Sequence, residues 1–556
     1  MYKKFSVLFL MLMLSVSLVT AQDPGPPSTL QPGESYTGLW SISYDYQTNG
    51  SVRYLVQDPA NSKNWCSILM GQPDSTTAVG VGRRVYYAYS DDNGATWTRD
   101  ILDDASNQGF PCITLSNGVP VIARHVSATV GTLVSKDAFF GAFGFANIPG
   151  VPTNLTGNLP IWPHIAGTAN GNLVLVAAPN NTDAFFANRT TWNNGSNTWS
   201  PYVQMSEISG PSGNFDVGSN SNGKVCIVGV NYIPAATATF ALRLYSSIDN
   251  GNTFDNGTDI FTNLIVGSDT LFANLAGGYS IVYVGDEPHV IFAAYNAYAT
   301  ATPNLNAYQT PSLYHWSVST GLDLIASRTN IPTLADTIFQ VNMVPITQPT
   351  ITILPSGKLL CAYTVFLDGN VQTVQNGDVL NAGEIFTSVS SDNGNTWSTP
   401  KNETNTPFVE EKHPSLAPKT SSDSLRLYYV RDKLAGAWVQ QTAWGLGPVY
   451  GIFKKAAITV GIRENVSIAK DYELFQNYPN PFNPTTTISY YVQKTGLVTL
   501  KVYNALGREV ASLVNDIQTQ GPKEITFAGN KLASGIYYYS ITAGDFRDTK
   551  KMMLIK

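Results

Sequence analysis

The sequence is poor in charged residues and has no excess of basic ones. Only 13% of its 556 residues are Asp, Glu, Lys or Arg, and the formal net charge is −6. A chain of this kind offers no basic field to a phosphate backbone, which excludes nucleic acid as a partner. Beyond the first residues, no apolar run approaches the roughly 18 residues that a spanning helix needs. We therefore expect no transmembrane anchor.

Cysteine is also scarce, and none of the four cysteines has the spacing of a zinc site. Cys226 and Cys361 lie at the same register inside apolar runs, so we expect them to be buried free thiols. Cys66 and Cys112 occupy matching positions in adjacent repeats, where a disulfide bond and two free thiols are both open alternatives. The sequence indicates no metal site and no cofactor.

The first 21 residues have the pattern of an export signal. Lys3 and Lys4 precede an apolar stretch at 5–19, and Val19-Thr20-Ala21 forms a small-residue cleavage site. Residues 22–39 follow, rich in Pro, Gly and Ser, and we expect an irregular lead-in there. The mature protein is therefore expected to be exported.

One eight-residue phrase, Ser-x-Asp-x-Gly-x-Thr-aromatic, occurs three times. Asp hydrogen-bonds its own backbone, Gly supplies a positive φ, and the aromatic side chain anchors a turn to the strand below. The phrase therefore predicts a hairpin turn at each place. The residues assigned these structural roles are Ser90, Asp92, Gly94, Trp97, Ser247, Asp249, Gly251, Phe254, Ser390, Asp392, Gly394 and Trp397.

A longer repeat underlies the three phrases. A short apolar strand, a turn and an apolar run recur, with turns near Asp74, Gly118, Gly171, Gly223, Gly285, Gly357 and Asp423. Each unit leaves its apolar faces uncovered, so only stacking of the units around an axis closes a core. We predict an all-β propeller over residues 40–462, with seven blades favoured and six as the alternative. The phrases fall where the third strand of a blade precedes the fourth, and strands at 40–56 are expected to close the ring by pairing with the last blade.

The three phrases resemble the Asp-box, or BNR repeat, of the sialidase superfamily, which lies on the outer rim of propeller blades. Sialidases of that superfamily hold a substrate carboxylate with three arginines, the first in a Phe/Tyr-Arg-Ile-Pro phrase. Here Val52-Arg53-Tyr54 and Gly82-Arg83-Arg84-Val85 lack the Ile-Pro continuation. We therefore assign no catalytic residue, and the sequence favours a protein that is not an enzyme.

A set of polar and aromatic residues at strand ends forms the candidate ligand site. These ends are expected to face one mouth of the channel and to hold a sugar or carboxylate. The alternative is that they form rim salt bridges and packed strand ends. The candidates are Arg124, His125, His413, Tyr428, Tyr429, Arg431 and Asp432. Glu410 and Glu411 could act as paired carboxylates, but neighbours in a strand point to opposite faces.

Residues 472–556 resemble the type A sorting domain of the type IX secretion system, found in Bacteroidetes-like bacteria. The motifs that carry the resemblance are Tyr478-Pro479-Asn480-Pro481, Tyr503-Asn504-Ala505-Leu506-Gly507-Arg508 and Leu532-Ala533-Ser534-Gly535-Ile536-Tyr537. The prolines and the alternating apolar residues predict a small immunoglobulin-like β-sandwich after a linker at 463–471. The resemblance implies the secretion machinery as a partner and a secreted or outer-membrane surface location.

Three functions fit these observations. The first is an exported propeller that binds a glycan or another extracellular ligand. The second is a diverged glycoside hydrolase of the sialidase type. The third is a structural or adhesion module of the cell envelope.

Overall fold

The computed structural model divides the chain into two compact units, Met1–Gly461 and Ile462–Lys556. Every regular element that it describes is a β-strand, and within the described ranges no helix could cross a membrane. The expected signal peptide at 1–21 and linker at 463–471 lie outside these ranges. The described residues are 25–41, 51–72, 82–103, 107–126, 131–155, 158–179, 186–209, 215–230, 241–266, 269–273, 277–295, 310–335, 343–436, 447–458, 472–474, 477, 480–492, 496–518, 521–544 and 546–555.

In its described residues, the first unit forms seven antiparallel sheets that follow one another along the chain. The first contains β2 (Leu55–Gln57), β3 (Trp65–Gly71), β4 (Arg84–Ser90) and β5 (Thr98–Ile101). The second contains β6 (Gln108–Ser116), β7 (Val119–Val126), β8 (Gly131–Lys136) and β9 (Ala146–Asn147). The third contains β10 (Pro160–Gly167), β11 (Leu173–Pro179), β12 (Phe186–Asn193), β13 (Thr198–Trp199) and β14 (Val203–Ser209).

The remaining sheets of this unit are also antiparallel, and the last one includes a strand from the start of the chain. The fourth contains β15 (Phe215–Ser219), β16 (Val225–Val230), β17 (Leu242–Ser247) and β18 (Thr258–Phe261). The fifth contains β19 (Leu264–Val266), β20 (Asp269–Ala273), β21 (Tyr279–Val284), β22 (Glu287–Tyr295), β23 (Ser312–Ser317) and β24 (Gly321–Ser327). The sixth contains β25 (Ile346–Ile353), β26 (Leu359–Thr373), β27 (Val379–Ser390) and β28 (Lys401–Asn402). The seventh contains β29 (Glu410–Leu416), β30 (Ser424–Asp432), β31 (Val449–Ala457) and β1 (Glu34–Ser41).

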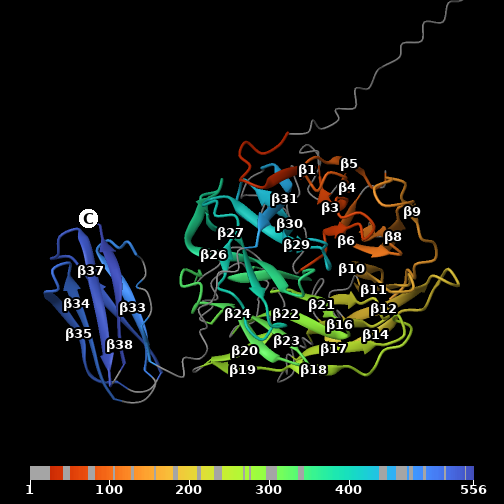
Figure 1. Cartoon of the computed structure of the whole chain (residues 1–556). Helices are drawn as coiled ribbons and strands as arrows, with labels where there is room; N and C mark the ends of the chain where they lie inside the picture. The colour runs from red at the N-terminus through yellow and green to blue at the C-terminus, as the bar shows by residue number, and fades with distance from the viewer. Residues whose placement is uncertain are drawn as a thin grey trace, which may run out of the picture. The chain divides into compact units, whose positions relative to one another are not determined.

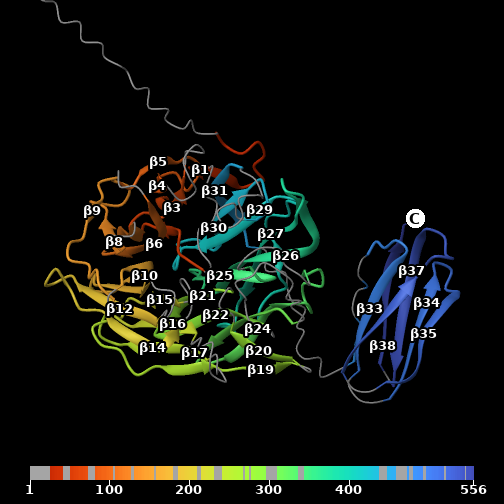
Figure 2. The ribbon, with the colours of Figure 1, turned by 180° about the vertical axis from the view of Figure 1, so that it is seen from behind.

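Each sheet packs against the next one in the chain. Strands β6, β10, β15, β21, β25 and β29 each contact the preceding sheet, and β29 also contacts β2 of the first sheet. Figure 1 shows the sheets following one another in this order around the first unit, and Figure 2 shows the same order from behind. Strands buried on both faces require continuous apolar runs, as in Leu173–Pro179, where every residue is buried. The prediction of an all-β protein with four-stranded antiparallel sheets, consistent with propeller blades, is confirmed.

The start of the chain differs from the sequence-based expectation. Strand β1 begins at Glu34, inside the stretch at 22–39 that we expected to be irregular, and it pairs with β31. The apolar run at Trp65 is the second strand of its sheet rather than the first, because β2 precedes it. A strand ending at Val56 was expected, and β2 overlaps it, but β2 pairs with β3 of the first sheet and not with the last sheet as predicted. The strand that pairs with the last sheet is β1, which overlaps the predicted range 40–56 only at Trp40 and Ser41.

The three repeated phrases form turns of one geometry, each between the third and fourth strand of its sheet as predicted. In the first, Ser90 Oγ donates to Asp92 Oδ1 at 2.8 Å, and Gly94 N donates to Ser90 Oγ at 2.9 Å. Asn93 and Gly94 both have positive φ, 63° and 77°. A Cβ on Gly94 would lie 2.2 Å from the Phe453 ring of the seventh sheet, so the turn is pressed against its neighbour.

The other two phrases repeat this arrangement against the preceding sheet. Thr191 of the third sheet donates to the carbonyl of Gly251 at 2.6 Å. In the third phrase, Trp397 Nε1 donates to the carbonyl of Gly394 at 2.9 Å, and the Trp397 ring lies 5.5 Å from that of His315 in the fifth sheet. These turns therefore hold neighbouring sheets together.

All four cysteines are buried free thiols. This agrees with the expectation for Cys226 and Cys361. Of the two alternatives for Cys66 and Cys112, the structure contains the free thiols, and Cys66 Sγ lies 2.6 Å from Tyr87 Oη. The two positions do not match in register, because Cys66 lies in the second strand of its sheet and Cys112 in the first strand of the next.

The second unit contains two antiparallel sheets that share one hydrophobic core, including Ile488, Leu500 and Tyr539. Their inward residues alternate with outward polar ones, as the sequence predicted for this segment. The first sheet contains β32 (Glu473–Leu474), β33 (Thr485–Val492) and β36 (Gly521–Ala528). The second contains β35 (Glu509–Gln518), β34 (Gly496–Asn504), β37 (Gly535–Ala543) and β38 (Phe546–Leu554).

Candidate functional site

The predicted site residues lie on strands of two separate sheets. Arg124 and His125 belong to β7 of the second sheet, and Tyr428, Tyr429, Arg431 and Asp432 belong to β30 of the seventh. His413 lies on β29, the neighbour of β30. The first sheet, β2 to β5, follows the seventh around the unit and precedes the second. The described contacts of Arg124 and Arg431 therefore form two networks rather than the single cluster that we expected.

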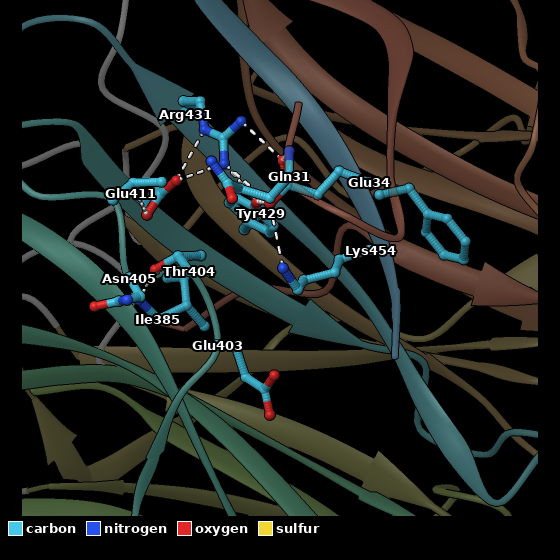
Figure 3. A network of polar contacts seen from close by, with 12 residues as sticks. Gln31, Glu34, Ile385, Glu403, Thr404, Asn405, Glu411, Tyr429, Arg431 and Lys454 are labelled. Carbon is cyan, nitrogen blue, oxygen red and sulfur yellow. Dashed lines mark hydrogen bonds and ion pairs between the residues drawn. The ribbon is translucent and has the colours of Figure 1, made fainter. Parts of the chain in front are cut away.

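Arg431 is the centre of a buried ion network (Figure 3). Its Nη1 donates to Glu34 Oε2 at 2.9 Å, its Nη2 to Glu34 Oε1 at 3.0 Å, and its Nε to Glu411 Oε1 at 2.8 Å. Nη1 also donates to the carbonyl of Thr29, and Nη2 to Tyr429 Oη. A guanidinium has five N–H donors, and here all three of its nitrogens are engaged within the fold.

This network also attaches the start of the chain to the last sheet. Glu34 lies on β1, accepts a hydrogen bond from Tyr429 Oη at 2.6 Å, and is 3.4 Å from Lys454 Nζ on β31. The pairing of β1 with β31 thus has a buried charge–charge contact in addition to its backbone hydrogen bonds. This partner could not be predicted from local sequence, because 397 positions separate Glu34 from Arg431.

Glu411 is a carboxyl group of this network whose pKa lies near neutral pH. Burial raises its pKa from 4.5 to about 7, although Arg431 and hydrogen bonds from Thr406 and Thr404 oppose the shift. Glu384 adds to the rise by charge repulsion. Glu384 in turn accepts a hydrogen bond from Thr404 Oγ1 at 2.7 Å.

The raised pKa of Glu411 predicts a pH dependence of stability. Between pH 4.5 and about 7 the folded chain keeps a proton that the unfolded chain releases, so stability falls as pH rises through this window. At 1.36 kcal/mol per pK unit the loss is about 3 kcal/mol. We expect Glu411→Gln to remove this contribution. Urea unfolding of both proteins at pH 5 and pH 8 measures it, and equal pH slopes in the two proteins would contradict the assignment.

The neighbouring carboxylate has different partners. Glu410 Oε1 lies 2.7 Å from Lys412 Nζ, and Gly436 N donates to Glu410 Oε2 at 2.6 Å. Glu410 and Glu411 therefore point to separate environments, as expected for adjacent residues of a strand. This arrangement does not form the paired acid and nucleophile of a glycoside hydrolase.

Arg124 is fully buried, and its partners belong to its own sheet and to the segment that precedes it. It forms an ion pair with Asp103 and donates to Gln108 Oε1 at 2.8 Å and to Ser135 Oγ at 2.7 Å. The ring of His125 lies 4.7 Å from that of Phe110. Burial, with a contribution from Arg83, lowers the pKa of His125 to about 3. The imidazole is therefore neutral at pH 7.

His413 and Tyr428 belong to the packed interior rather than to an open mouth. Both are at most 2% exposed, and both rings lie against Tyr54, with centroids 6.4 Å and 6.2 Å away. Burial, with a contribution from Lys412, holds the pKa of His413 well below its usual value. Burial raises the pKa of Tyr428.

A further buried ion pair joins Arg53, which precedes the first sheet, to Asp216 of the fourth sheet. Arg53 Nη2 lies 3.2 Å from Asp216 Oδ2 of β15 and also donates to the carbonyl of Val217. His164 Nδ1 of β10 lies 3.6 Å from Asp216 Oδ1. Arg53 precedes the first sheet, yet it binds the fourth, and residues 51–54 are all buried. This segment is therefore packed against inner strands and is not open to solvent.

The described residues contain no group of three or more His, Cys, Asp or Glu side chains that could hold a metal ion. The fold and these contacts define an all-β protein with blade-like sheets, in which the buried Arg53, Arg124 and Arg431 form internal ion pairs.

Comparison with known proteins identifies the C-terminal part of the chain. Residues 476–556 match the family described as "Secretion system C-terminal sorting domain", so the chain carries a type IX sorting domain, which implies secretion or a cell-surface location. No curated protein matches the chain.

Solved structures match over longer stretches at low identity. PorZ, a surface component of the type IX secretion system of Porphyromonas gingivalis, is 12% identical with a TM-score of 0.34; the match covers 93% of this chain and 61% of PorZ. Trypanosoma rangeli sialidase is 11% identical with a TM-score of 0.36, covering 94% and 89%. The β-propeller domain of the Trilobed protease from Pyrococcus furiosus is 9% identical with a TM-score of 0.36, covering 68% and 92%. The chain spans less than two thirds of PorZ.

Proposed function

We propose that the chain is a seven-bladed propeller exported by the type IX secretion system, which acts outside the cell by binding a glycan or another extracellular ligand. The proposal of binding without catalysis rests on one observation: three buried arginines already have carboxylate partners within the fold. Arg431 is held by two carboxylates, Arg124 by one and Arg53 by one. A carboxylate of a substrate would have to displace these internal partners from buried positions.

The seven-bladed assignment is supported by the contacts between sheets. Seven sheets follow one another in the described residues, each contacts the next, and β2 contacts β29. The outer strand of the seventh sheet, β1, comes from the start of the chain, which is a common means of closing a ring of sheets. The alternative of six blades would require two of these sheets to share one blade.

The diverged hydrolase is the second candidate function. Burial raises the pKa of Glu411 to about 7, a value suited to a general acid, and charge repulsion from Glu384 contributes to the rise. Glu411 is also paired with Arg431 at 2.7 Å and fully buried. We therefore rank binding above hydrolysis.

The purified chain on a glycan array and with a panel of fluorogenic glycosides tests the proposal. We expect binding to a limited set of glycans and no turnover, with binding retained in Glu411→Gln. Turnover that Glu411→Gln abolishes would establish the hydrolase instead. Neither binding nor turnover would reject both and favour a structural or adhesion module of the envelope.

A further inference from the structure

The C-terminal unit presents one polar sheet face away from its own core. Along β34, Val498, Leu500 and Val502 are buried in the core, so the alternating residues Thr499, Lys501 and Tyr503 point outward. On β37 the buried residues are Tyr537, Tyr539 and Ile541, and Tyr538, Ser540 and Thr542 point outward between them. The two strands are adjacent, so their outward residues form one surface.

This face contains a depression of about 500 Å³. Its lining combines two tyrosines, several hydroxyl groups and two cations, and none of the lining residues is acidic. The lining residues on which the argument depends are Lys501, Tyr503, Asn504, Tyr538, Ser540 and Arg547. The charge of the depression therefore complements an anion.

The register places the aromatic and the cationic parts in order along the sheet. Tyr503 lies opposite Tyr538, Lys501 opposite Ser540, and Thr542 opposite Arg547 of β38. Thr542 lies four positions after Tyr538 on the same strand, which is about 13 Å at roughly 3.3 Å per residue. A chain of linked sugar rings can span such a distance, whereas a single small anion cannot contact both ends.

We propose that this face of the sorting domain binds an acidic polysaccharide. The rings of Tyr503 and Tyr538 offer apolar surfaces to sugar rings, and the Ser, Thr and Asn side chains donate to and accept from sugar hydroxyl groups. Arg547 and Lys501 bind the carboxylates, with Arg547 able to bind one in a bidentate manner. This site is separate from the ligand site proposed for the propeller, and its failure would leave that proposal untouched.

One internal contact competes with the ligand. Lys501 Nζ lies 2.9 Å from Glu509 Oε2, with both side chains more than a third exposed. Water screens exposed pairs of this kind and leaves them weak, so an incoming carboxylate can replace Glu509. Arg547 is exposed and lies beside Thr542, at the end of the depression away from Tyr503 and Tyr538.

Affinity electrophoresis of the full chain in gels containing polygalacturonate tests the proposal, with fully methyl-esterified polygalacturonate as the neutral probe. We expect retardation by the acidic polymer only, and an at least tenfold weaker apparent affinity for Arg547→Ala and for Tyr538→Ala. The matched controls are Lys531→Ala and Ile517→Ala, which change exposed residues outside the depression and should bind as the unmodified chain does. Absence of retardation, equal retardation by the neutral polymer, or unchanged binding in both face variants would overturn it.

Discussion

Replacing Arg431 by methionine should lower the free energy of unfolding of the first unit by about 3–5 kcal/mol at pH 8, the loss typical of a buried ion pair with one partner removed. Glu34 and Glu411 would remain buried without their cation, since Arg431 donates to both at 2.8–3.0 Å. The attachment of β1 to the last sheet would weaken as well. Urea unfolding followed by tryptophan fluorescence measures the change.

Arg426→Met is the matched control, because Arg426 lies on the same strand and its described partners are Ser424, Leu425 and Asn93 rather than a carboxylate. We expect it to change stability by less than about 1 kcal/mol, as for most partly exposed positions. If both variants unfold alike while Arg431→Met loses ligand binding, then Arg431 serves a ligand and not the fold. A second readout is binding by folded Arg431→Met well below its melting temperature, which we expect to be retained.

Local patterns were predictable from the sequence because neighbouring residues determine them. The turns at Ser90, Ser247 and Ser390 depend on hydrogen bonds between residues at most four positions apart. The strand position of these turns was predictable too, since a turn phrase after an apolar run can only connect two adjacent strands. The apolar alternation in the C-terminal unit likewise predicted its sheets.

The partners of the buried arginines could not be predicted in this way. Arg431 meets Glu34 across 397 positions and Arg53 meets Asp216 across 163. Such pairs depend on how whole sheets are ordered, and nothing near Arg431 in the sequence distinguishes an ion pair from a ligand site. The pairing of the short strand β2 could not be predicted either. The sequence therefore predicts the run at Trp65 as the first strand of its repeat, although it is the second, and Cys66 and Cys112 as equivalent positions.

Removing residues 472–556 should abolish export while leaving the first unit folded. The two units are compact separately and have distinct cores, so the first unit is expected to fold without the second. The matched family covers 476–556, which places the export determinant inside the deleted part. We expect the truncated chain to accumulate in the periplasm of a bacterium that has a type IX secretion system.

The fraction of the chain found outside such a cell is the most direct test of the account, measured by protease accessibility on intact cells together with immunoblots of the medium. A periplasmic marker protein controls for leakage, and circular dichroism of the purified truncated chain controls for its folding. We expect the full chain to appear outside the cell, and the outside fraction to fall at least tenfold for the chain ending at 471. An equal outside fraction for the two chains would contradict it.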